Sequence, residues 1–207
     1  MSGRLLANLV LVPTILLTLG VNASRVAALG EEARGSGPAF GNPWAIAIEA
    51  NGNLVVTDRG LEAVVRVNPL SGDRTIVSDA NIGSGPAFGN PWAITTEANG
   101  NLVVVDAGLK AVVRVNPVSG DRTIVSNANI GPGPGFGDPF DIAIEPSGDL
   151  MVVDRGLEAV VRVNPLSGER TIVSDANIGS GPGLKDPFDI AIEPSGDSVV
   201  VERGLKA

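Results

Sequence analysis

The chain repeats itself every 48 residues over most of its length. Residues 35–82 and 83–130 align without a gap and share 41 of 48 residues. The same frame continues through residues 131–178 and into a partial fourth copy, residues 179–207. A unit this short cannot bury a core alone, so the copies must stack on one another. The repeat therefore predicts an array of similar units.

Each copy contains four β-like runs separated by turn signals. Asn51-Gly52 is a strong hairpin signal, and Asp58-Arg59-Gly60 and Asn68 to Gly72 also read as turns. Four short antiparallel strands at this spacing indicate an all-β fold of β-propeller blades, three complete and a partial fourth. A β-solenoid is the alternative, although its coils are usually shorter. In the first copy the expected strands are Trp44 to Glu49, Leu54 to Thr57, Ala63 to Val67 and Arg74 to Val77.

Two stretches of each copy carry a family resemblance. Pro43 to Glu49 and Gly52 to Asp58 resemble the NHL repeat, which runs approximately P-x-G-I-A-V-D and then G-N-I-Y-V-A-D. Pro139 to Glu145 and Pro187 to Glu193 resemble it equally. The resemblance covers residues 35–207 and implies a propeller of about six blades that serves chiefly as a binding platform, with some relatives acting as lyases.

Composition excludes several kinds of chemistry. The chain has no His, Cys or Tyr, so Ser-His-Asp triads, His-ligated zinc, thiolate sites and disulfides are ruled out. Its net charge of −8 argues against nucleic acid as a partner, since phosphate binding needs a basic surface. No EF-hand or calcium-binding nonapeptide is present, and we expect neither a metal nor another cofactor.

The first 23 residues have the layout of a secretory signal peptide. Arg4 precedes an apolar stretch from Leu5 to Leu19, and Ala23 offers a small-residue cleavage site before Ser24. The alternative is a retained membrane anchor, but the stretch is shorter than the ~20 residues that a spanning helix needs. We expect a secreted or periplasmic protein, with no membrane association after cleavage.

The number of copies predicts that one chain does not close a ring. The fourth copy supplies only two strands, and residues 24–34 read as a degenerate strand and a linker. Because closed rings have about four to eight blades, we expect either a homodimer that forms an eight-bladed ring or a fragment of a longer propeller.

Candidate binding residues recur where the first strands begin and in the following turns. An aromatic, a carboxylate and a guanidinium on the top face of the propeller suit a protein or a polar small molecule with an apolar part. The structural alternative is that the aromatics fill gaps between blades and the arginines pair with acidic neighbours. The candidates are Trp44, Trp92, Phe140, Phe188, Asp141, Asp189, Arg59, Arg155 and Arg203.

Other recurring charges predict structural roles. Asp58, Asp106, Asp154 and Glu202 should accept backbone N–H groups in the turn that follows the second strand. Two series of arginines should form solvated cross-strand pairs on outer strands: Arg66, Arg114 and Arg162, and Arg74, Arg122 and Arg170.

No residue is expected to be catalytic, because nothing singles out a partner for the two candidate aspartates. The sequence thus favours an exported, non-catalytic binding scaffold. The alternative is a fragment of an extracytoplasmic propeller lyase or a lactonase-like hydrolase. Such an enzyme would use Asp141 and Asp189 alone, or a metal held by Asp and Asn as in lactonase-like propellers.

Overall fold

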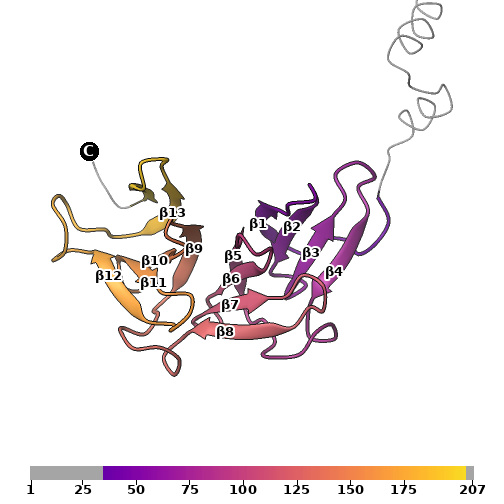
Figure 1. Cartoon of the computed structure of the whole chain (residues 1–207), viewed down its shortest axis with the longest axis horizontal. Coiled ribbons are helices and arrows are strands. Elements are labelled where there is room, and N and C mark those ends of the chain that lie inside the picture. Colours follow the sequence, from indigo (N-terminus) through magenta and orange to yellow (C-terminus); the bar gives the residue numbers. More distant parts are fainter. Residues whose placement is uncertain (1–34, 204–207) are drawn as a thin grey trace, which may run out of the picture.

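The computed structural model describes residues 35–203, so the expected leader, the linker and the last four residues lie outside the described part. The described chain forms three four-stranded antiparallel sheets and a two-stranded one. They stand side by side along an open arc (Figure 1). The strands are β1 (Pro43–Ile48), β2 (Leu54–Asp58), β3 (Ala63–Val67), β4 (Arg74–Ser78), β5 (Pro91–Thr96), β6 (Leu102–Asp106), β7 (Ala111–Val115), β8 (Arg122–Ser126), β9 (Pro139–Ile144), β10 (Leu150–Asp154), β11 (Ala159–Val163), β12 (Arg170–Ser174), β13 (Pro187–Ile192) and β14 (Ser198–Glu202).

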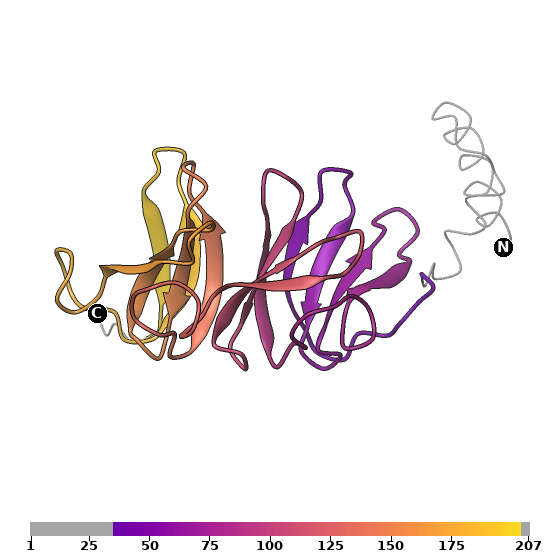
Figure 2. The same ribbon diagram turned by 60° about the horizontal axis from the view of Figure 1, so that its bottom comes forward.

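Each complete sheet is a meander, with the order β1-β2-β3-β4 in the first blade and equivalent orders in the next two. The prediction of three complete copies and a partial fourth is confirmed, and the strand bounds differ from those expected by at most one residue. Figure 2 shows the sheets as successive upright blades. None of the described residues forms a helix that is long and apolar enough to cross a membrane.

The turns follow the residues that predicted them. Gly52 adopts a φ of 85° in the β1–β2 turn, a conformation that costs little only for glycine. Asp58 accepts hydrogen bonds from the backbone N–H groups of Gly41, Asn42 and Leu61 at 2.8, 2.8 and 3.0 Å. The predicted role of Asp58 in its turn is confirmed, and the same side chain also fastens the segment that leads into β1.

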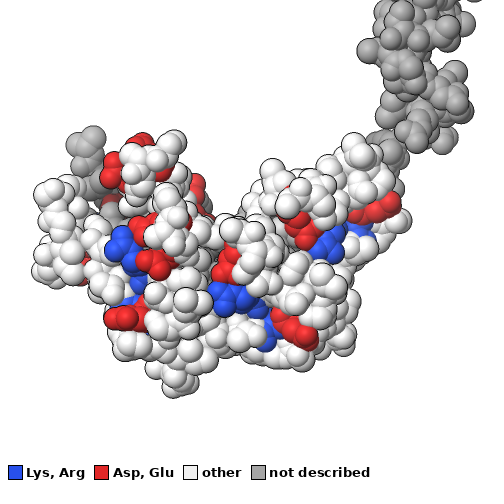
Figure 3. All heavy atoms as spheres, in the orientation of Figure 1, with Lys and Arg blue, Asp and Glu red and all other residues white. Residues whose placement is uncertain are grey.

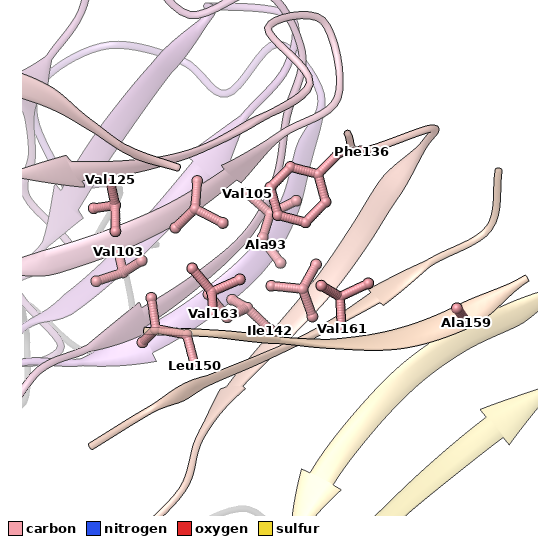
Figure 4. Close-up of a cluster of buried hydrophobic side chains, with 12 residues drawn as sticks. Ala93, Val103, Val105, Val125, Phe136, Ile142, Leu150, Ala159, Val161 and Val163 are labelled. Atoms are coloured by element: carbon pink, nitrogen blue, oxygen red, sulfur yellow. The ribbon is translucent and has the colours of Figure 1, made fainter. Parts of the chain in front are cut away.

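The core lies between blades rather than within one. A cluster of small aliphatic side chains fills the boundary between the second and third blades, including Val103 and Val105 from β6 and Ile142 from β9 (Figure 4). An equivalent cluster joins the first and second blades. Each blade therefore depends on its neighbour for burial, as stacked repeats should.

One series of outer-strand arginines pairs with acidic neighbours as predicted, although the glutamates are largely buried and not solvated. Arg66 makes a two-pronged contact with Glu49 across β2, and Arg114 does the same with Glu97. Arg66 also donates to the carbonyl of Pro117 at 3.0 Å, so the pair connects two blades. On the face drawn in Figure 3, basic and acidic side chains lie next to one another.

The prediction of solvated pairs was wrong for Arg122 and Arg170, which are 5% and 3% exposed. Arg122 donates to Ser78 Oγ and to the carbonyl oxygens of Ile82 and Pro86. The Gly/Pro-rich connection between blades folds over the guanidinium, and its carbonyl groups replace water. Burial accordingly lowers the pKa of Arg122.

Candidate functional site

Six of the nine candidate residues line one cavity at the inner rim of the arc. Its volume is about 450 Å³, and Pro43, Ala45 and Ala93 complete its wall. The rim aromatics in this wall are Trp44, Trp92, Phe140 and Phe188, and the rim aspartates are Asp141 and Asp189. The topology brings these side chains together because the first strand of every blade lies innermost.

A β-bulge places each rim aromatic. In β1 the pairing with β2 skips Trp44, since Pro43 pairs with Asp58 and Ala45 with Thr57. The same shift occurs at the equivalent positions of β5, β9 and β13. A bulge redirects a side chain away from strict alternation, which turns the aromatic and the residue after it toward one cavity.

The rim aromatics form a continuous row. Ring centroids are 4.4 Å apart for Trp44 and Trp92, 4.6 Å for Trp92 and Phe140, and 4.9 Å for Phe140 and Phe188. Their exposure differs sharply, because Trp44 is 45% exposed and Phe140 only 4%. Phe140 therefore fills a gap between blades while also bordering the cavity, and Trp44 offers an accessible ring.

The turn arginines, Arg59, Arg155 and Arg203, lie behind this row and do not line the cavity. The Arg59 guanidinium is 3.8 Å from the Trp92 ring centroid, and Arg203 is 3.9 Å from that of Phe188. Such stacking holds a cation on an aromatic face. The structure thus separates these three candidates from the other six.

Two turn arginines connect adjacent blades through hydrogen bonds. Arg59 Nε donates to Asn90 Oδ1, and Arg155 Nε donates to Asp186 Oδ1 at 2.7 Å. The sequence reasoning missed Asn90 and Asp186, although both stand two residues before a rim aromatic in their copies. That recurring polar position was the signal available in the sequence.

The rim aspartates form an interacting pair. Asp141 Oδ2 accepts a hydrogen bond from the Ile190 backbone N–H at 2.9 Å. Burial, together with a hydrogen bond to Asp189 and the charge of that side chain, raises the pKa of Asp141 to about 7. Two carboxyl groups this close cannot both ionise without cost, so Asp141 retains a proton well above the usual range.

The described part of the chain has no evident set of metal ligands. No group of three Asp, Glu, His or Cys side chains lies close enough to hold an ion there. The cavity can therefore offer aromatic faces, small apolar side chains and two carboxyl groups.

Comparison with known proteins finds similarity in structure alone. No family model matches the chain, and no curated protein matches it. A nidogen/laminin complex aligns with a TM-score of 0.61 and 21% identity, covering 79% of this chain and 56% of the matched one. Virginiamycin B lyase from Staphylococcus aureus aligns with a TM-score of 0.59 and 17% identity, over 78% and 49%.

A gluconolactonase from Xanthomonas campestris gives a TM-score of 0.62 and 17% identity, over 79% of this chain and 55% of that one. These matches show a β-propeller fold. The chain spans about half the length of these solved structures. The similar structures include a protein complex and two enzymes, so the fold alone does not select a function.

Proposed function

We propose that this β-propeller chain is a non-catalytic binding scaffold whose ligand occupies the cavity at the inner rim. The observation that carries the proposal is the composition of the cavity wall, where an accessible Trp44 ring and the other rim aromatics adjoin the rim aspartates. Apolar walls with a few convergent polar groups are typical of small-molecule sites. A protein segment that inserts a side chain there fits the same description.

The charges in the wall favour a ligand with a positive group. Asp141 and Asp189 are the charged residues that line the cavity, and the turn arginines lie behind the aromatic row. An ammonium group can pair with the carboxylates while an apolar body rests on the rings. Binding of a cation would also release the proton that Asp141 holds below about pH 7.

A pair of matched probes tests this proposal. We expect 2-phenylethylammonium to bind the full chain more tightly than neutral 2-phenylethanol in calorimetric titrations at pH 8. Trp44→Ala and Asp189→Asn should each weaken the ammonium probe about tenfold, a loss of about 1.4 kcal/mol. Thr123→Ala, on an exposed part of β8, is the matched control and should bind as the parent does.

Equal affinity for the two probes, or an equal loss in the control variant, would contradict the assignment of the cavity. The proposal would also be wrong if neither probe bound and a wider set of organic cations also left the Trp44 fluorescence and the NMR shifts of the rim residues unchanged.

Carboxylate chemistry is the second candidate. The raised pKa of Asp141 would let it donate a proton near neutral pH, as a general acid does. Hydrolysis or elimination assays on lactone and ester substrates test it. Activity that is lost in Asp141→Asn but kept in Thr123→Ala would replace the scaffold proposal with an enzymatic one.

The scaffold is proposed to work outside the cytoplasm, on the strength of the leader-like segment from Arg4 to Ala23. Intact-mass measurement of the exported fraction should find Ser24, or a close neighbour, as the first residue. A membrane-bound product that begins at Met1 would contradict export by cleavage.

A further inference from the structure

Both ends of the arc present apolar side chains to solvent. On β1, Ile46 and Ile48 are 59% and 67% exposed. On β14, Val199 and Val201 are 49% and 51% exposed. We call the first surface the head face, made by β1, and the second the tail face, made by β13 and β14.

The equivalents of Ile46 and Val201 are buried wherever two blades meet inside the chain. Ile94, Ile142 and Ile190 occupy the position of Ile46 in later copies and are 5% to 6% exposed. Val105 and Val153 occupy the position of Val201 and are fully buried. The head and tail faces are therefore the two halves of a joint that the described chain forms three times.

The strands that make this joint are present at both ends. The first strand of a blade packs mainly against the first and second strands of the preceding blade: β5 against β1 and β2, β9 against β5 and β6, and β13 against β9 and β10. The tail face consists of a first and a second strand, β13 and β14, and the head face of a first strand. The inner-strand part of the joint can thus form on the tail side, although the outer-strand side chains that join each internal cluster, such as Val112 and Val125, have no counterpart in the described part of the tail face.

Polar groups on the head and tail faces correspond to those that meet at an internal joint. Inside the chain, Arg155 donates to Asp186, the residue that corresponds to Asn42 on the head side. The tail face carries Arg203 at the position of Arg155, and Arg203 is exposed.

Asp189 extends this match to the backbone. Its counterpart Asp141 accepts the backbone N–H of Ile190, whose counterpart on the head side is Ile46. Apolar contacts, a guanidinium partner and a backbone N–H partner therefore coincide in one register.

We propose that a second copy of this chain packs head to tail on the first, its head face covering the tail face with the contacts of the internal joints. The occupant is a second copy because its head face already bears the residues and register that the tail face binds elsewhere in the molecule. The joint places Trp44 of one copy beside Phe188 of the other, which continues the aromatic row. Such an interface is heterologous and joins two different surfaces.

Two complementary variants of the full chain test this arrangement. Light scattering on the parent chain should give at least twice the mass of one chain, and no more than twice where two copies close into a ring through two joints. Ile46→Lys with Ile48→Lys blocks the head face, and Val199→Lys with Val201→Lys blocks the tail face. Each variant alone should be monomeric, because either change removes one half of every joint, and the dissociation constant should rise at least 100-fold.

An equimolar mixture of the two variants should restore a one-to-one pair, since one free head and one free tail remain. Val118→Lys, at a turn tip of the second blade that is 94% exposed, is the control and should assemble as the parent does. Circular dichroism confirms that each variant is folded.

A folded monomeric parent, or a pair that persists in both blocked variants, would overturn the proposal. Blocked variants that stay monomeric when mixed would overturn it as well. That result would mean that both faces of each copy take part in one symmetric interface. If further blades of a longer polypeptide cover the two faces instead, that longer protein would be monomeric. The same substitutions, made in the longer protein, would prevent it from folding.

Discussion

The inner rim has two halves built on one scaffold. In the first and second blades a tryptophan is followed by alanine, Trp44-Ala45 and Trp92-Ala93, whereas Phe140-Asp141 and Phe188-Asp189 occupy the same positions in the third and fourth. Both halves use the same bulge and the same strand register. One half therefore offers an apolar wall and the other a pair of carboxyl groups, and the cavity is asymmetric although the backbone repeats.

This contrast teaches that the repeat determines where a side chain points, and the individual copy determines its chemistry. The exposure of the rim positions is set by a third factor, the presence of a neighbouring blade. Trp44 is 45% exposed at the end of the arc, whereas Phe140 is 4% exposed between two blades. Substitutions in each half should separate these contributions.

The largest effect is expected from Phe140→Ala in the carboxylate half. Phe140 is buried between blades, and deletion of a packed aromatic costs about 3–5 kcal/mol. In the unpaired chain, Trp44→Ala should cost less than about 1 kcal/mol, because nearly half of that side chain is already in water. Urea denaturation of both variants measures the difference, and equal losses would mean that Trp44 is covered in solution.

The backbone was largely predictable from the sequence. Turn residues such as Asn51-Gly52 and Asp58 have fixed conformational or hydrogen-bonding preferences, so the strands between them could be placed within one residue. The inner position of the candidate aromatics followed from blade geometry. These features are local or belong to the repeat, which is why one copy was sufficient to infer them.

Contacts between blades were less predictable. Arg122 was expected in solvent, but the connection from the preceding blade covers it. The stacking of Arg59 on Trp92, a residue of the next copy, was also missed. The β-bulge at each rim aromatic was missed as well, because strict alternation along a strand does not predict the direction in which the bulge points the side chain. The first two depend on distances between copies, which the sequence of one copy does not contain, and the third on the pairing register within a blade.

The next effect comes from giving the apolar half a carboxyl group. Ala93→Asp places an aspartate at the position of Asp141, where Ala93 is 2% exposed. The cost at pH 8 should be roughly 2–3 kcal/mol, since a buried carboxylate must lose water or keep its proton. At pH 4 the loss should be smaller. Denaturation at both values checks this, and a loss independent of pH would point to steric strain alone.

Replacement of Asp141 by an uncharged residue should abolish a pH dependence of the free energy of unfolding. The pKa of Asp141 is raised from 3.8 to about 7 in the folded chain, so the native state holds a proton that the unfolded chain has released. The free energy of unfolding should therefore fall as the pH rises from about 4 to about 7, by an amount on the order of 1–3 kcal/mol.

In Asp141→Asn this fall should be absent, because the amide does not ionise and its oxygen can still accept the Ile190 N–H. Denaturation midpoints across pH 4 to 8 provide the measurement, with Thr123→Ala as the control. A fall of equal size in both variants would assign the pH dependence to other carboxyl groups.

The smallest effect should come from repairing the one interruption in the turn arginines. Ala107 stands where Arg59 and Arg155 stand in neighbouring copies, and Asp138 occupies the position of their hydrogen-bond partners Asn90 and Asp186. Ala107→Arg should stack on Phe140 and pair with Asp138, adding about 0.5–1 kcal/mol of stability. Thermal denaturation in low and high salt separates the two contributions, because salt screens the ion pair with Asp138 and leaves most of the stacking. A destabilised variant would mean that Arg155, whose Nη1 lies 3.9 Å from Asp138, already uses that carboxylate and repels a second guanidinium.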